Sequence, residues 1–202
     1  MPIDIVKPPK RLTLAPAKQR ILDTADRLFY DEGIRAVGID RLIAASKVTK
    51  ATFYKHYGSK DRLIVDYVAY RHLQISELLD EVAQSTDDPL EMLRGVAEVQ
   101  VRFLSAPGFR GCPFLNAAAE FTDASHPVRR AVEDHREWFH EIIETLLRQI
   151  GHPLPGDAAD DLMLARDGAM SGGYAGDAIA ASAALSRMYD RVIDAVGERA
   201  AA

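Results

Sequence analysis

The sequence predicts an all-α protein of two modules, and three observations support this prediction. Apolar residues recur at spacings of three and four along most of the 202 residues, as they do in amphipathic helices. Glycines and prolines separate these segments at distances that suit helices, and no segment alternates apolar with polar residues for long enough to predict a strand. The length suits a small module joined to a larger helical one.

The N-terminal segment is predicted to begin with a flexible arm, residues 1–16, because it holds several prolines and no apolar block like that of a secretory signal. An amphipathic stripe over residues 21–29 then predicts a first helix, which Gly33 ends. Apolar residues about a turn apart over residues 39–45 predict a second, short helix, with Gly38 at its N-cap.

A third short helix is predicted over residues 50–57, with Thr49 as its N-cap and Gly58 at its end. Ser59 is the natural N-cap of a long fourth helix, which continues to about residue 84. This fourth helix is apolar on more than one side, so it is expected to contact two bodies.

Three more helices follow from the same periodicity, over residues 90–104, 128–147 and 185–196. Between the last two, the glycines of residues 170–184 cost about 1 kcal/mol each against alanine in a helix interior. That segment is predicted to be either a broken helix or a loop.

The charge distribution favours a nucleic-acid contact at the N-terminal end, although the net charge of the chain is -5. Residues 1–60 carry twelve Lys or Arg against six Asp or Glu, whereas residues 61–202 carry thirteen against twenty-four. All seven lysines lie at or before Lys60, so the strongly hydrated cations suited to phosphate contact are confined to one end. The chain therefore has a basic head and an acidic body.

A helix-turn-helix motif lies in the basic head. Two short helices joined by a tight turn, the second exposing short polar and cationic groups, fit a DNA major groove. The segment VTKATFYKHYGSKDRL has this character, and residues 17 to about 65 resemble the N-terminal domain of the TetR family of repressors. An aromatic-rich recognition helix, a short turn and a lysine are the most specific part of the resemblance.

The resemblance implies a DNA-binding domain over residues 17–62 and a ligand-binding and dimerisation domain over residues 63–202. It implies that one set of side chains reads base edges and a second set contacts phosphates, while Phe53 and Tyr57 pack inward. The predicted DNA-contact residues are Thr49 at the helix start, Lys50, Ala51 and Thr52 at the bases, and Tyr54, His56 and Lys60 at the phosphates.

Two positions depart from the family pattern. Lys47 stands in the turn where the family usually has glycine, and a left-handed conformation there costs on the order of 1 kcal/mol. Gly38 stands where Ser or Thr usually caps the second helix, although glycine is a tolerable cap.

The segment RGCPFLNAAAEFTDASHPVR resembles the C-terminal domain of one branch of the same family. This resemblance implies a small-molecule ligand enclosed by helices and a homodimer formed by the C-terminal helices, where the apolar stripe of residues 185–196 lies. Plain core packing is the alternative for every candidate ligand contact. The candidate wall residues are Phe103, Cys112, Phe114, Asn116, Trp138 and Met170.

The residues show no catalytic, cofactor or metal pattern. Cys112 is the single cysteine, and its Gly-Cys-Pro context indicates a turn with a small buried thiol. His135 and His140 are five apart, off one helical face, so they do not predict a metal pair. No apolar run is long enough to cross a bilayer, and a cytoplasmic protein is expected.

The function predicted is that of a repressor that binds a near-palindromic double-stranded DNA operator as a dimer and is released by a small molecule. It is not expected to be an enzyme. Two alternatives remain open at this point: an architectural DNA-binding protein that responds to no ligand, and, less favoured, a small-molecule enzyme.

Overall fold

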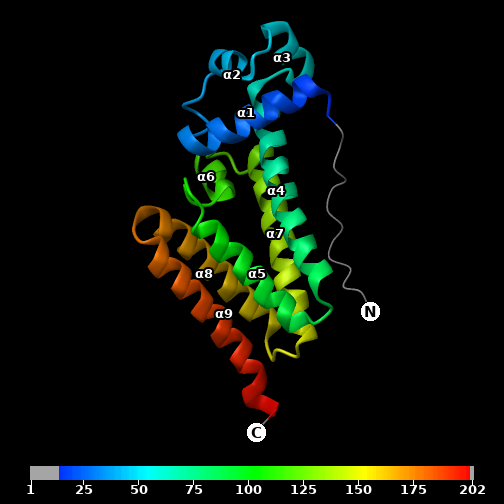
Figure 1. Ribbon diagram of the computed structural model, residues 1–202, viewed down its shortest axis with the longest axis vertical. Coiled ribbons are helices and arrows are strands. Elements are labelled where there is room, and N and C mark those ends of the chain that lie inside the picture. The colour runs from blue at the N-terminus through cyan, green and yellow to red at the C-terminus, as the bar shows by residue number, and fades with distance from the viewer. Residues whose placement is uncertain (1–13, 201–202) are drawn as a thin grey trace. The chain divides into compact units, whose positions relative to one another are not determined.

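The computed structural model describes residues 14–200, and every regular element in this part of the chain is an α-helix (Figure 1). The prediction of an all-α chain is therefore confirmed. Most of the predicted arm, residues 1–13, lies outside the described residues, and the first helix already begins at Pro16. No described helix is long and apolar enough to cross a membrane.

The described chain forms two compact units, each assembled from separate segments. The head unit comprises residues 14–74 and Pro113–His135, and the body unit comprises Ile75–Cys112 and residues 136–200. The chain therefore passes from one unit to the other after Gln74, Cys112 and His135. The predicted boundary at residue 62 separates a DNA-binding domain from a ligand-binding and dimerisation domain. This division by function stays a prediction.

The head unit is built around three mutually packed helices, α1 (Pro16–Glu32), α2 (Ile39–Ser46) and α3 (Lys50–Tyr57). The apolar stripe of α1 is buried, and it meets the buried residues of α2 and α3 in one core. Removing these side chains from water provides the main stabilisation of such a small core. The fully buried members of the core include Ile21, Ala25, Val37, Leu42 and Phe53.

The helix ends of the head are set by local chemistry. Gly33 and Gly58 follow α1 and α3 with φ of 92° and 71°, values that glycine adopts without strain. The Thr49 hydroxyl accepts the backbone N–H of Thr52 at 3.1 Å, and the Ser59 hydroxyl accepts that of Arg62 at 3.2 Å. The predicted ends of the first, third and fourth helices are confirmed by these contacts.

Helix α4 (Lys60–Ser85) belongs to both units, because its residues up to Gln74 lie in the head and the remainder in the body. Helix α7 (Pro127–Gln149) is divided in the same way at His135. The short helix α6 (Pro113–Ala119) belongs to the head, and the periodicity missed it because seven residues form barely two turns.

The body unit contains three further helices: α5 (Pro89–Leu104), α8 (Pro155–Ala175) and α9 (Ala178–Ala200). Helices α8 and α9 lie side by side, and α5 packs against α9 (Figure 1). The segment 170–184, which was predicted as a broken helix or a loop, is a broken helix: α8 continues to Ala175, and α9 starts two residues after Gly176. Packing overrides the low helix propensity of its glycines, because Gly173 is buried against Leu104 and α9.

The apolar stripe near the C-terminus is not a free surface. Leu185, Tyr189 and Val192 are buried inside the body unit, where α9 packs against α5 and α8 of the same chain. Met188, Ile193 and Val196 of the same stripe are half-buried. The homodimer expected through the C-terminal helices stays a prediction.

Candidate nucleic-acid interface

Helix α3 buries one face and exposes the other. Phe53 and Tyr57, which are one turn apart, have almost no exposed surface, so the prediction that they pack inward is confirmed. On the opposite face Lys50 and Ala51 are exposed, and Tyr54 exposes 42% of its surface while its ring meets Phe53 edge-on at 5.5 Å. The helix thus presents cationic and phenolic groups to solvent on a fixed support.

The buried face of α3 is anchored to α1 through Tyr57. The Tyr57 hydroxyl donates a hydrogen bond to the Lys18 carbonyl at 3.0 Å, and the Lys18 ammonium lies 5.2 Å from the centroid of the Tyr57 ring. Burial raises the pKa of Tyr57, so its hydroxyl keeps the proton that it donates. Lys18 also pairs with Asp66 of α4 at 3.0 Å, which ties three helices of the head together.

The start of α3 is ordered by its own side chains. Thr49 is exposed, and its hydroxyl lies 2.9 Å from the Thr52 hydroxyl as well as accepting the Thr52 backbone N–H. Thr52 and His56 are half-buried on the same helix. The first N–H groups of a helix favour phosphate and other anions, and the Lys50 ammonium stands at this end.

The turn before α3 contains a strained residue. Lys47 has φ 54° and ψ 45°, the left-handed conformation, and it is the sole non-glycine residue with positive φ in the described chain. The predicted departure from glycine at this position therefore does place a side chain in a costly conformation. Gly38 caps α2 in an extended conformation and supplies no side-chain hydrogen bond.

Lys60 contacts the protein itself. Its ammonium donates a hydrogen bond to the Ile34 carbonyl at 2.6 Å and lies 5.8 Å from the centroid of the Phe29 ring. Burial lowers the pKa of Lys60, although the Glu120 carboxylate acts in the opposite direction. The phosphate contact of Lys60 stays a prediction, because in this structure its ammonium holds the loop between α1 and α2.

Glu120 also holds that loop, and no pattern in the sequence indicated this role. Its carboxylate accepts the backbone N–H groups of Ile34 at 2.8 Å and of Arg35 at 2.6 Å. The partners lie 86 and 85 positions apart in the chain, so no local pattern could reveal the contact. Lys60 and Glu120 together bind the backbone carbonyl and N–H of Ile34. These two contacts hold the loop that leads from α1 into α2.

The predicted wall residues of a ligand site are divided between the two units. Phe103, Cys112, Trp138 and Met170 belong to the body, and all but half-buried Phe103 are buried there. The Cys112 thiol lies 3.6 Å from the buried guanidinium of Arg166.

The two remaining candidates belong to the head. Phe114 is buried and stacks on the His135 ring, whereas Asn116 is exposed. None of the six candidates lines either of the two hollows found in the body unit, so their ligand contacts stay predictions.

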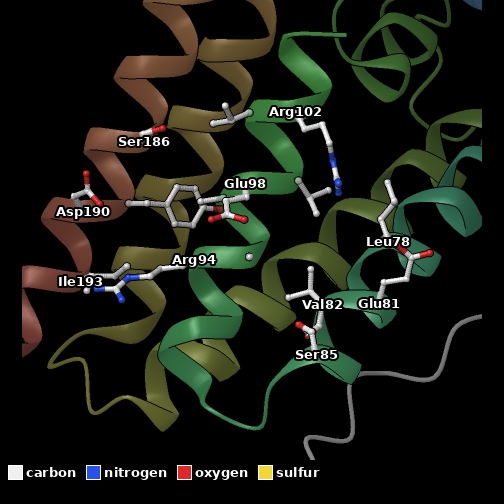
Figure 2. Close-up of a pocket in the computed structure, with 15 residues that line it drawn as sticks. Leu78, Glu81, Val82, Ser85, Arg94, Glu98, Arg102, Ser186, Asp190 and Ile193 are labelled. Atoms are coloured by element: carbon white, nitrogen blue, oxygen red, sulfur yellow. Dashed lines mark hydrogen bonds between the residues drawn. The ribbon is translucent and has the colours of Figure 1, made fainter.

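The larger hollow, of about 690 Å³, lies in the body unit between the second half of α4, α5 and α9 (Figure 2). This volume suits a small organic molecule. Its wall combines apolar residues with charged side chains of both signs, among them Glu81, Arg94, Glu98, Arg102 and Asp190. The described residues contain no group of three or more side chains suited to hold a metal ion.

A second, shallower hollow of about 430 Å³ lies between α8 and α9. Small residues line most of it, including Gly168 and Gly172 on one helix and Ala180 and Ala184 on the other. Large apolar side chains stand exposed on the same two helices: Leu164 exposes 70% of its surface and Ile179 exposes 84%.

Comparison with known families gives two matches along the chain. Residues 21–67 match the bacterial regulatory proteins of the tetR family, and this range contains the helix-turn-helix and its exposed α3 face. Residues 89–151 match the tetracyclin repressor-like C-terminal domain. Both resemblances suggested by the residues are confirmed.

Individual relatives agree with these matches. The solved structure of SCO4454, a TetR-family transcriptional regulator from Streptomyces coelicolor, is 40% identical, with a TM-score of 0.86 over 89% of this chain and 95% of that one. The HTH-type transcriptional regulator LmrA of Bacillus subtilis is 29% identical over 67% of this chain and 73% of its own length. The HTH-type transcriptional repressor NemR of Escherichia coli is 26% identical over 57% of this chain and 59% of its length. These relatives are transcriptional regulators rather than enzymes.

Proposed function

Because the chain belongs to the TetR family of transcriptional regulators, we propose that it is a repressor that binds a near-palindromic operator as a homodimer and is released by a small molecule. The observation that supports operator binding best is the α3 surface, where cationic and phenolic side chains are exposed above a firmly buried Phe53 and Tyr57. Such a protein acts on DNA in the cytoplasm. The relative NemR is named a transcriptional repressor, which supports repression rather than activation.

The proposed DNA contacts follow from the position of each side chain on α3. Exposed Lys50 and Ala51, with Thr52 beside them, face base edges, and exposed Tyr54 offers a hydroxyl to phosphate and a ring face to a thymine methyl group. His56 adds a phosphate contact at the end of the same helix. Thr49 orders the helix start, and Lys60 would need to leave the Ile34 carbonyl to reach a phosphate.

The proposed dimer uses the outer surface of α8 and α9. One recognition helix reads few base pairs, and a two-fold dimer doubles them, which is why a near-palindromic site is expected. The small residues of the shallow hollow would let a helix of a second copy approach closely, and exposed Leu164 and Ile179 provide apolar area beside it. The expected dimer of the C-terminal helices would form through this surface, which includes Leu185 and Met188 of the apolar stripe.

The proposed ligand site is the larger hollow of the body unit. Four residues of its wall, Leu78, Glu81, Val82 and Ser85, belong to α4 (Figure 2). Helix α4 begins in the head unit directly after α3. A ligand that displaces this end of α4 would also move the part of the same rigid helix that lies in the head unit. The reciprocal coupling expected for such a switch is about 1–3 kcal/mol.

The first test is DNA binding by the full chain. Genome-wide mapping of bound DNA supplies the operator, and fluorescence anisotropy then measures its affinity over a series of salt concentrations. The native protein should lose affinity steeply with salt, because each phosphate contact adds about -0.9 to the slope of log K against log salt. Lys50→Ala should reduce the preference for the operator over unrelated DNA.

Arg148→Ala serves as the matched control, since Arg148 is a surface cation of the body unit bonded to Glu144 one turn away. It should leave both the slope and the preference unchanged. A native slope near zero would exclude DNA binding. Tight binding without any sequence preference would instead indicate an architectural DNA-binding protein.

A further inference from the structure

Two histidine rings of the head unit meet through the same kind of nitrogen. The Nδ1 atoms of His72 on α4 and His135 on α7 are 3.0 Å apart, and the rings are nearly perpendicular at 87°. His135 exposes only 1% of its surface, and its other face stacks on Phe114 of α6 with centroids 3.5 Å apart. Three helices of the head therefore join through one imidazole pair.

The position of this cluster is unusual. The chain passes between the two units after Gln74, Cys112 and His135, and each of these points lies within two residues of a member of the cluster. His72, Phe114 and His135 thus lie at the three points where the described part of the chain passes between the units. A change in this cluster therefore takes place beside all three of these connections.

The chemistry of the pair sets a limit on its charge. An Nδ1···Nδ1 contact of 3.0 Å is a hydrogen bond in which one ring donates a proton and the other accepts it. One additional proton on the pair is compatible with this contact, since a single hydrogen still lies between the two nitrogens. When both rings are charged, two N–H donors and two positive charges face each other, and the contact cannot persist.

The charged groups around the pair do not offset the repulsion that arises when both rings are charged. Burial lowers the pKa of His72, and this effect outweighs the Asp134 carboxylate of α7, which acts in the opposite direction. Arg71, the neighbour of His72 on α4, is held by Asp26 of α1. The ring of Phe114 covers one face of His135, with the centroids 3.5 Å apart.

We propose that the His72–His135 pair is a proton-operated switch that joins α4, α6 and α7 at neutral pH and separates when acid charges both rings, weakening operator binding. The link to DNA rests on the proposed function, whereas the separation of the rings does not. A histidine with a lowered pKa takes up more protons in the unfolded chain, so its contribution to stability is complete above pH 6.5 and is lost as the pH falls below that value.

The test compares the native chain with His72→Asn, whose amide stands near the position of the Nδ1 atom and can bond His135 without titrating. Operator affinity is measured by anisotropy at pH 7.5 and 5.5, at one ionic strength and in metal-free buffer. The native protein should lose roughly tenfold more affinity than His72→Asn, because one linked proton changes an equilibrium by up to tenfold per pH unit. His56 is present in both proteins, so its contribution cancels from the ratio.

His140→Asn is the control, since His140 lies on α7, like His135, but in the body unit. Its Nε2 atom is 3.1 Å from Asp160. It should retain the native pH dependence. Equal pH dependence in the native protein and His72→Asn overturns the proposal, and so does a loss of the dependence in His140→Asn.

A measurement without DNA separates this proposal from the proposed function. In urea unfolding, the folding equilibrium constant of the native chain should fall between pH 7.5 and 5.5 by up to tenfold per pH unit more than that of His72→Asn. Absence of operator binding at pH 7.5 would contradict the proposed function alone. If His72→Asn does not fold, the native rings decide by NMR: coupled titration of His72 and His135 supports the switch, and two independent single-step curves overturn it.

Discussion

Lys47 holds the tight turn of the helix-turn-helix in a conformation that suits glycine. Its φ of 54° brings Cβ close to the following carbonyl, which costs roughly 1–2 kcal/mol in a residue with a side chain. The exposed Lys47 side chain makes no contact that offsets this cost among the hydrogen bonds and ion pairs of the described residues. The turn therefore persists because α2 and α3 pack on α1 on either side of it.

Lys47→Gly should accordingly stabilise the protein by about 1 kcal/mol, because glycine adopts this backbone without strain. The measurement is the midpoint of urea unfolding, which should rise without a change of slope. Lys55→Gly is the control, since Lys55 is exposed inside α3, where glycine should lower the stability by about 1 kcal/mol. A Lys47→Gly midpoint at or below the native one would show that the turn is not strained.

At the scale of whole helices, the close approach of α4 and α5 depends on one glycine. A Cβ at position 95 of α5 would overlap Cγ1 of Val82 on α4, and the branched valine cannot easily move aside. Both residues line the larger hollow of the body unit. Gly95 therefore determines how close α5, which forms one wall of the hollow, lies to the end of α4.

Gly95→Ala should destabilise the protein by about 1–3 kcal/mol, since the cost of overpacking exceeds the gain in helix propensity. Adding Val82→Ala should recover part of this loss, because it removes the two nearest of the three Val82 atoms that the new Cβ meets. Gly156→Ala is the control, as a Cβ there meets nothing within 4 Å. Additive effects of the two substitutions in urea unfolding would contradict the predicted contact.

At the scale of the whole molecule, the proposed dimer depends on the apolar surface that the folded monomer leaves uncovered on α8 and α9. Leu164 precedes Gly168 by one turn, so both lie on the same face of α8 beside the shallow hollow. Because the stripe of α9 is already buried, charges placed in it would disrupt the fold rather than the assembly. Exposed positions give the cleaner test.

Leu164→Arg combined with Ile179→Arg should convert the dimer to monomers at micromolar concentration, because two like charges would face their symmetry copies across the interface. Sedimentation velocity measures the change, and circular dichroism should show unchanged helix content. Leu154→Arg is the control, since Leu154 is equally apolar and exposed but precedes α8 and lies outside the hollow. A native protein that sediments as a monomer would contradict the proposed assembly.

The sequence by itself determined the features that depend on neighbouring residues. The caps at Thr49 and Ser59 and the glycine ends of the first and third helices were all predicted, because each involves atoms only a few positions apart. The resemblance to the TetR family, rather than any period, identified Phe53 and Tyr57 as the buried face of α3. The family resemblance then linked the opposite face to DNA.

Only the tertiary structure decided the contacts between residues distant in the chain. Glu120 and the Ile34 backbone are 86 positions apart, and His72 and His135 are 63 apart. The hollow likewise brings α4 and α5 together with the distant α9. Periodicity shows that a residue is buried on some face, but not which residue it meets there. That partner is set by how helices pack, so Lys60 bonds a carbonyl and the stripe of α9 is covered within its own chain.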